Sequence, residues 1–188
     1  MTFLWIILGL VVLVAVFVAV SYNRFVSQRN LVQESWRQID VELKRRHDLI
    51  PNLVETVKGY AEHEKDVFEA VTEARAGVQA AAAGDDVAAK AAADAKLQGA
   101  LVNLNAVAEA YPDLKANQNF QDLQRQLAET EDRIAAGRRF YNANVRALNT
   151  RVESFPSNLV ASTFGFHKEE YFEVEDQAVR SAPTVDFS

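Results

Sequence analysis

The chain contains no cysteine, and only 7 of its 188 residues are glycine and 4 are proline. Without cysteine, disulfide bonds, a thiol nucleophile and a cysteine-ligated metal site are all excluded. The scarcity of glycine and proline, combined with heavy use of alanine, favours helices. The formal net charge of −6 argues against bulk nucleic-acid binding, and the length fits one small domain.

Sequence motifs for catalysis are missing as well. The chain has no glycine-rich phosphate loop and no His-Glu-x-x-His zinc motif. A carboxylate-bridged metal site in a helical bundle needs Glu three residues before His, but Lys44, Tyr60 and Phe164 hold those positions. No serine lies in a nucleophile elbow. We therefore expect no enzymatic activity, no metal and no cofactor.

Charge is absent from one long stretch, the 18 residues from Phe3 to Val20. As a helix this stretch would be roughly 27 Å long, close to the hydrocarbon thickness of a bilayer. Residues 1–21 are therefore predicted to form a transmembrane anchor that contacts the bilayer through residues 3–20. The alternative is a cleaved signal peptide with a weak cleavage site at Ala19–Ser21, but no basic residue precedes the apolar run.

Basic residues follow the apolar run and none precedes it. The positive-inside rule then places the soluble body in the cytoplasm, as part of a single-pass membrane protein. The basic residues nearest to the run are widely spaced, so a periplasmic or extracellular body is the alternative. The residues concerned are Arg24, Arg29, Arg37, Lys44, Arg45 and Arg46.

Apolar residues then recur at alternating steps of three and four, which predicts a helix that buries one stripe. The stripe keeps its phase across Pro51, so the sequence predicts one helix over residues 22–82 that is bent at this proline. Arg46 and Glu64 occupy stripe positions where a polar residue can fix register. The apolar members are Phe25, Val32, Trp36, Ile39, Leu43, Ile50, Leu53, Val57, Tyr60, Val67, Val71 and Ala74.

Further helices are expected over residues 86–110, 117–153 and 157–164, with a break at Gly84-Asp85-Asp86 and a turn at Tyr111–Phe120. The predicted fold is therefore all-α: an N-terminal transmembrane helix followed by an elongated antiparallel bundle of three long helices plus a short C-terminal helix. The tail, residues 168–188, carries a net charge of −4 and is expected to be extended.

Helix direction follows from this layout, because short connections make neighbouring helices antiparallel. The first helix leaves the membrane, the second returns and the third runs outward again. The segment Phe155–Phe166 is then expected at the far end from the bilayer. This position argues against an interfacial membrane anchor and favours packing across the open end of the bundle.

The stretch "RRHDLIPNLV", Arg45–Val54, combines charged residues with a proline. His47 and Asp48 point about 100° apart on a helix, so they do not form a catalytic pair. We interpret His47, Pro51 and Asn52 as a helix bend, where the proline frees the carbonyl of His47 and Asn52 lies near enough to bond to it. The neighbouring Lys44-Arg45-Arg46 cluster is interpreted as a solvated face rather than a headgroup site.

Four long blocks of the sequence resemble the LemA family: "RRHDLIPNLVETVKGYAEHE", "EAVTEARA", "AEAYPDLKANQNFQDLQRQLAETEDRIAAGRRFYN" and "ESFPSNLVASTFGF". The resemblance covers nearly the whole chain after Tyr22. It implies a bacterial membrane-anchored protein with an antiparallel helical bundle, here residues 22–167, located in the inner membrane. It supplies no catalytic residue.

The functional hypothesis is a non-catalytic scaffold or adaptor of the bacterial envelope that acts through protein–protein contacts. Its partners would be other membrane or envelope proteins and a further copy of the chain, with no nucleic acid. A lipid-binding or membrane-shaping protein is the alternative, and a metal-dependent hydrolase using His47 and Asp48 is a third hypothesis. The candidate interaction residues are Tyr111, Pro112, Asp113, Phe120, Phe155, Phe164 and Phe166.

Overall fold

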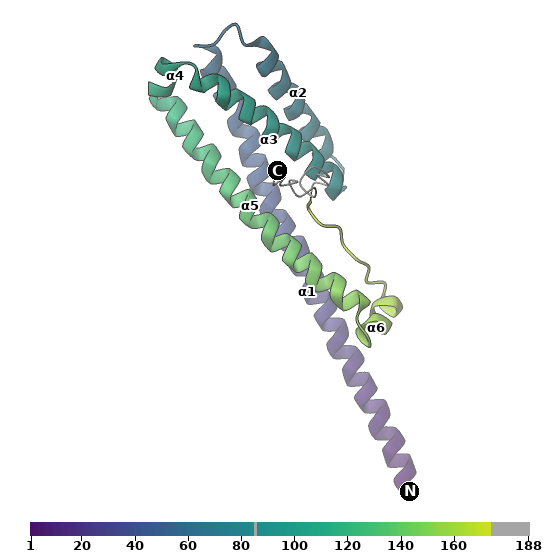
Figure 1. Ribbon diagram of the computed structural model, residues 1–188. Coiled ribbons are helices and arrows are strands. Elements are labelled where there is room, and N and C mark those ends of the chain that lie inside the picture. Colours follow the sequence, from purple (N-terminus) through teal and green to yellow (C-terminus); the bar gives the residue numbers. More distant parts are fainter. Residues whose placement is uncertain (85, 174–188) are drawn as a thin grey trace, which may run out of the picture. The chain divides into compact units, whose positions relative to one another are not determined.

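The computed structural model describes residues 1–84 and 86–173, and within these residues it contains helices and no strand (Figure 1). The all-α prediction is therefore confirmed. The helices are α1 (Thr2–Lys58), α2 (Lys65–Ala82), α3 (Val87–Glu109), α4 (Pro112–Ala116), α5 (Gln118–Glu153) and α6 (Ser157–Phe164). Among the described residues of the predicted tail, 168–173 lie in neither helix nor strand, and the rest of the tail lies outside this range.

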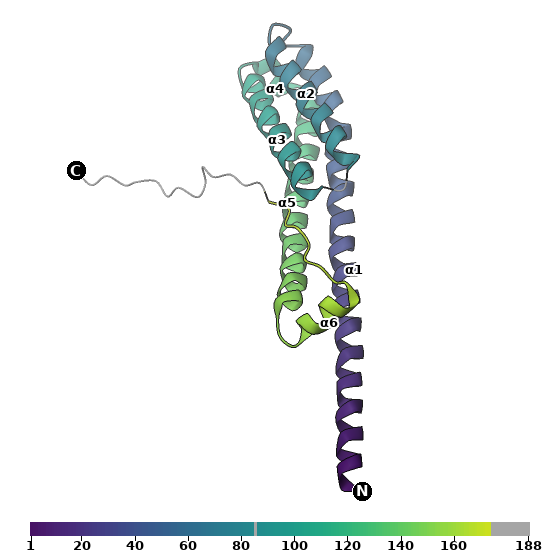
Figure 2. The same cartoon turned by 90° about the vertical axis from the view of Figure 1, so that its right-hand side faces the viewer.

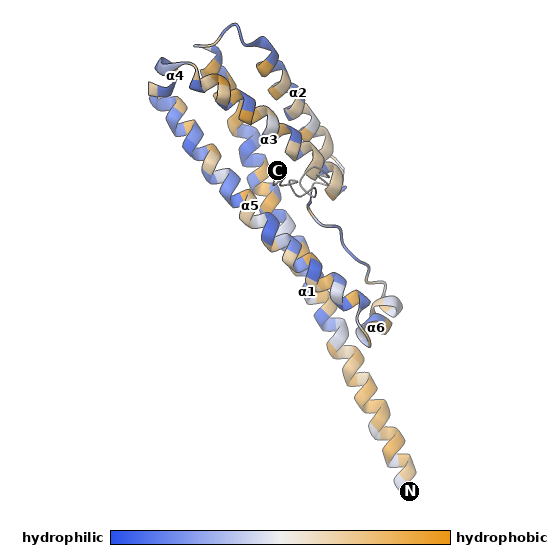
Figure 3. Cartoon of the chain, in the orientation of Figure 1, coloured by the Kyte–Doolittle hydropathy of each residue, from blue (hydrophilic) through white to orange (hydrophobic). Residues whose placement is uncertain are grey.

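Two compact units make up the chain. Unit 1 contains residues 1–55 and 118–171, and therefore most of α1 with α5 and α6. Unit 2 contains residues 56–117, with α2, α3 and α4, and the described residues 172 and 173. The apolar N-terminal part of α1, orange over its whole circumference in Figure 3, belongs to unit 1.

The first helix ends earlier than the sequence pattern predicts. Helix α1 stops at Lys58, and α2 begins only at Lys65 after a non-helical link. The prediction of one helix over residues 22–82 is therefore wrong, and so is the stripe position of Glu64, which is the residue before α2. In α2 the buried residues are Phe68 and Val71. Val71 was on the predicted stripe, but Phe68 is buried in place of the predicted Val67.

Helix α5 runs antiparallel to α1 within unit 1, because residue numbers that increase along one helix decrease along the other at their contacts (Figure 2). Four side-chain hydrogen bonds show this order, each written with the α1 residue first: Arg46–Glu131, Glu42–Arg133, Ser35–Asn144 and Gln28–Arg151. The C-terminal end of α5 therefore lies beside the part of α1 that follows the apolar run.

Helix α6 consequently lies at the end of unit 1 next to the apolar run and not at the far end, as the sequence-based layout expected. The Phe164 ring centroid is 5.0 Å from that of Tyr22, two residues beyond the run. The reason for the error is the additional break after Lys58. It makes α5 the fourth long helix instead of the third, which reverses the direction expected for it.

The segment after α6 is held against α5. Gly165 adopts a left-handed conformation at φ 70°, which ends α6 and lets the Phe166 amide donate to the carbonyl of Ala161. Asn149 then bonds both backbone groups of Glu169, each at 2.9 Å. Asn149 thus fixes the position of this segment relative to α5, as buried polar residues can do by pairing with one specific partner.

Unit 2 is built around the α2–α3 hairpin. The break at residues 84–86 is confirmed in its described part, because α2 ends at Ala82 and the Asp86 side chain accepts a bond from the Ala89 amide at 2.9 Å. Within α3 the side chains that are buried form a stripe: Ala91, Asp94, Leu97, Ala100, Leu101, Leu104 and Ala108. At the C-terminal end of α4, the side-chain amide of Asn117 donates to the Tyr60 hydroxyl at 3.0 Å.

Candidate functional site

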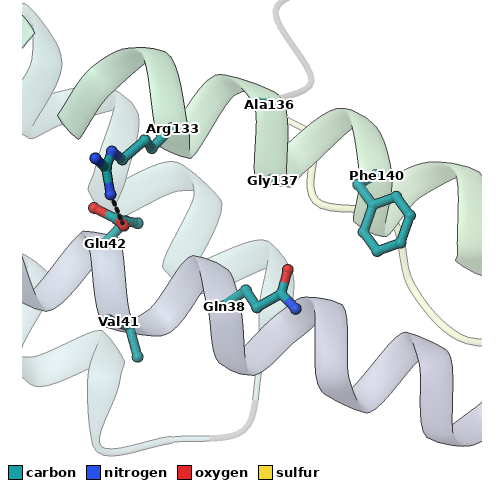
Figure 4. A pocket seen from close by; sticks show the side chains of 7 residues that line it. All are labelled: Gln38, Val41, Glu42, Arg133, Ala136, Gly137 and Phe140. Atoms are coloured by element: carbon teal, nitrogen blue, oxygen red, sulfur yellow. Dashed lines mark hydrogen bonds and ion pairs between the residues drawn. The ribbon is translucent and has the colours of Figure 1, made fainter. Parts of the chain in front are cut away.

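A groove of about 530 Å³ lies between α1 and α5 in unit 1 (Figure 4). Its apolar surface comes from Val41 and Phe140, which are 65% and 51% exposed, and from Ala136. Charge is confined to one end, where Arg133 pairs with Glu42 at 3.5 Å. An apolar surface with a charged pair at its edge suits contact with an apolar protein side chain more than binding of a polar metabolite.

Close approach of the two helices shapes this groove. A Cβ atom added to Gly137 would lie 2.9 Å from Cγ1 of Ile39, closer than side-chain contacts allow. Ile39 is buried on the stripe predicted for α1. Glycine at position 137 therefore lets α5 approach Ile39 beside the exposed side chains of Phe140 and Val41, which line the groove.

The polar stripe residue Arg46 is buried and forms an ion pair with Glu131, whose side chain is 26% exposed. The Arg46 side chain is 0% exposed, and its Nη1 donates to Oε1 of Glu131 at 3.0 Å. A buried guanidinium is costly unless it is paired, so this contact specifies which part of α5 faces Arg46. The structure thus places Arg46 at a structural position between α1 and α5, away from solvent.

The predicted helix bend lies within an unbroken helix. Pro51 is inside α1, and the helix continues to Lys58. Asp48 accepts from Lys44 at 3.4 Å on the exposed surface. The solvated-face interpretation therefore holds for Lys44, but it is wrong for Arg46, whose side chain is buried. His47 is partly buried and Asn52 is exposed. The structure brings no carboxylate cluster to His47, since the described residues contain no group of three or more potential metal ligands.

The aromatic contact residues predicted from the sequence divide into two groups. Phe155 and Phe164 are 80% and 49% exposed, so both rings are available at the surface. Phe120 and Phe166 are buried, and the Phe166 ring stacks on that of Phe25 at 4.8 Å. The last two therefore belong to the core and cannot serve as exposed contact residues.

The turn before α5 is the third predicted contact region. Tyr111 is the residue before α4 and is partly exposed, whereas Pro112 and Asp113 are exposed in the first turn of that short helix. Proline suits this position because its missing amide has no helical partner there. These residues lie in unit 2 and are available at its surface.

The sequence pattern did not predict the groove, because helical periodicity identifies the buried stripe and not the exposed residues beside it. Val41 and Phe140 lie next to stripe residues and not on the stripe. A large apolar residue beside the buried stripe of a helix can indicate an exposed contact surface, and both Val41 and Phe140 fit this description.

Tyr141 connects α5 to the segment that follows α6. Its hydroxyl donates to the carbonyl of Glu170 at 2.9 Å, and its ring lies 5.4 Å from that of Trp36. Burial, together with the charges of Glu169 and Glu170, raises the pKa of Tyr141 from 10.0 to about 12. The residue is therefore a neutral donor at physiological pH and has no role as a base.

The N-terminal part of α1 is long and apolar enough to cross a membrane, and none of it is buried by the rest of the described chain. It is the one such helix among the described residues. The helix continues without interruption from this part into the α1–α5 pair. The chain therefore carries one candidate transmembrane helix that is continuous with its folded body.

Comparison with known proteins gives related chains of two kinds. MamQ 1 and MamQ 2, magnetosome proteins of Paramagnetospirillum magneticum, are each 30% identical over 175 residues, which cover 81% of this chain and 64% of the relative. Protein LemA of Metamycoplasma hominis is 25% identical over 156 residues, covering 82% of this chain and 69% of the relative. The chain thus spans less than two thirds of the length of the magnetosome relatives.

A family model described as the LemA family matches residues 35–187. This match covers most of the chain, including all of α2 to α6. The helical architecture and the candidate transmembrane helix agree with what the sequence blocks implied. The chain belongs to the LemA family.

Proposed function

We propose that this protein is a membrane-anchored helical scaffold that acts through protein–protein contacts and not through catalysis. The observation that carries the proposal is the continuity of α1, a 57-residue helix that joins the candidate transmembrane segment to the folded body. A continuous helix transmits the orientation of its anchor to the surfaces of unit 1.

The groove at Val41 and Phe140 and the exposed turn at Pro112 and Asp113 are the surfaces proposed to meet partner proteins of the cell envelope. The partner class is another envelope protein or a second copy of this chain. The proposed location is the bacterial inner membrane, with residues 1–21 as anchor, residues 22–167 as the bundle and residues 168–188 as an acidic tail. The body is proposed to lie in the cytoplasm because Arg24 and Arg29 follow the span.

The experiment is photo-crosslinking in intact cells. A photoreactive amino acid at Phe140 is compared with the same amino acid at Glu129, which is exposed on α5 outside the groove. The proposal expects Phe140 to give discrete cross-linked products, identified by mass spectrometry, and Glu129 to give none of them. Absence of products from Phe140 and from Asp113 alike would reject the scaffold role. A reporter fused after Ser188 identifies the compartment.

A further inference from the structure

An uncharged segment with exposed apolar side chains surrounds α6. Residues 154–166, "SFPSNLVASTFGF", contain no acidic or basic side chain. Within this segment Phe155, Leu159 and Phe164 are 80%, 58% and 49% exposed. A single exposed apolar residue needs no explanation, but three of them within ten residues, with no charge among them, form an apolar patch that indicates a contact.

This patch adjoins the candidate transmembrane segment. A hollow of about 550 Å³ beside the patch is lined by Phe164 and by five residues of α1 near the end of the apolar run: Ala15, Val18, Ala19, Tyr22 and Asn23. The Tyr22 ring meets the rings of Phe164 and Phe166 edge-on, at 5.0 and 5.6 Å. Figure 2 shows α6 crossing close to α1, with the preceding turn directed toward the N-terminal part of α1.

The patch is fixed in this exposed position by contacts on both sides. At the start of α6, the Ser157 hydroxyl donates to the carbonyl of Arg151 at 2.7 Å. After α6, the Phe166 ring stacks on the Phe25 ring, and the Arg29 guanidinium lies 5.5 Å from its centroid. Lys168 then pairs with Glu153 at 2.8 Å, which closes the loop around α6. These contacts therefore hold the backbone of the segment in place on both sides of the exposed side chains.

We propose that α6 and the turn before it form an interfacial docking element, which inserts Phe155, Leu159 and Phe164 into the headgroup region of the bilayer that holds residues 3–20. This inference rests on the membrane anchorage in the proposed function. The bilayer is the occupant because the patch is continuous with the surface of the apolar run at Val18 and Ala19. Aromatic side chains are favoured at this depth of a membrane.

The chemistry of the patch also specifies the kind of lipid contact. Residues 154–166 contain no basic residue, so this segment itself does not attract anionic headgroups. Insertion of apolar side chains into the headgroup and acyl boundary depends on buried apolar area instead. The docking element is therefore expected to work equally in zwitterionic phosphatidylcholine vesicles and in vesicles that contain phosphatidylglycerol. Its effect is to hold unit 1 at one angle to the membrane surface.

The test uses spin labels, to which the chain is well suited because it has no cysteine. The full chain is reconstituted in phosphatidylcholine vesicles with a single label, using Phe155→Cys and Leu159→Cys in turn. Collisions with oxygen, which dissolves in lipid, are compared with collisions with a water-soluble nickel chelate. The matched control is Phe140→Cys, another exposed apolar residue of unit 1 on α5. Val11→Cys reports on the span itself.

The expected ratio of oxygen to nickel collisions is about tenfold higher at positions 155 and 159 than at Phe140, because only the former reach the lipid boundary. Ratios equal to the Phe140 value, with Val11 in lipid, would overturn the docking element and leave the anchor intact. A label at Val11 accessible to nickel would instead refute the membrane anchorage. Labels at 155 and 159 shielded from both reagents would show a protein contact, and would also overturn the inference.

Discussion

At the residue scale, Gly137 sets how closely the α1 and α5 helices approach. Gly137→Ala is expected to lower the free energy of unfolding by about 1–3 kcal/mol, because the new Cβ meets Ile39 at 2.9 Å and the β-branched neighbour has little room to move. Better helix propensity of alanine offsets part of this loss. Denaturant unfolding followed by circular dichroism in detergent micelles measures the change.

Two other helical glycines serve as controls for that substitution. An added Cβ meets nothing within 4 Å at Gly77 or at Gly99. Gly77→Ala and Gly99→Ala are therefore expected to stabilise the protein by roughly 1 kcal/mol each through helix propensity alone. If Gly137→Ala behaves in the same way as these two variants, α5 does not approach Ile39 as described.

The ion pair of the buried Arg46 is the second residue-scale feature. Glu131→Ala leaves the fully buried Arg46 without the carboxylate 3.0 Å away, and is expected to cost about 3–5 kcal/mol of unfolding free energy. The matched control is Asp48→Ala, which removes an exposed pair with Lys44 and should cost less than about 1 kcal/mol. Equal costs for both variants in thermal unfolding would show that Arg46 is solvated.

Alkaline titration tests the contact of Tyr141. Its pKa is about 12 in the folded chain and 10.0 in the unfolded chain, so the stability that it supplies is complete below pH 10. The unfolded state loses the proton first as pH rises, and about 2–3 kcal/mol is lost between pH 10 and pH 12. Tyr141→Phe lacks this loss, so the wild-type chain should be the more stable of the two at pH 9 and the less stable near pH 12. A pH-independent difference in unfolding free energy would contradict the assignment.

At the element scale, the sequence predicts α3, α5 and α6 to within a few residues but misses the end of α1. Periodicity reports which face of a helix is buried, and it does not report whether the chain is continuous. Val71 and Ala74 happen to keep the phase of α1, although Phe68 and not Val67 is the buried residue beside them. The sequence feature that could have predicted the end of α1 is Gly59, which directly follows the last helical residue, Lys58.

The candidate site could be predicted only in part, for a related reason. Phe155 and Phe164 were expected at the surface and are exposed there, whereas Phe120 and Phe166 are buried. All four residues are phenylalanines, so residue type alone does not distinguish the exposed rings from the buried ones. Their exposure depends on tertiary partners such as Phe25, which lies more than 100 residues from Phe166 in sequence and becomes its neighbour only because α5 returns along α1.

Pro51 gives a prediction about a whole helix. The α1 helix continues through this proline, which cannot donate a backbone hydrogen bond to the His47 carbonyl. Pro51→Ala restores the missing backbone donor opposite the His47 carbonyl, and is expected to raise the free energy of unfolding by up to about 3 kcal/mol. Asn52→Ala, at an exposed neighbouring position, is the control. A loss of stability in Pro51→Ala alone would contradict this expectation and show that the packing of α1 requires proline at this position.

At the scale of the whole molecule, the chain belongs to the LemA family, and among its described residues one helix, α1, is long and apolar enough to cross a membrane. Its proposed function depends on the orientation that this helix imposes on unit 1. Both the groove at Val41 and Phe140 and the docking element require α5 to return along α1 toward the apolar run.

Distances between two spin labels test this claim most directly. Asn30→Cys on α1 is paired in turn with Thr150→Cys and with Glu129→Cys on α5, all three at exposed positions of unit 1. The antiparallel arrangement predicts that the first pair is the closer one, because Glu129 lies roughly 30 Å from Thr150 along the axis of α5 at 1.5 Å per residue. A shorter distance for the pair with Glu129→Cys would mean that α5 runs outward with α1, and would contradict the account.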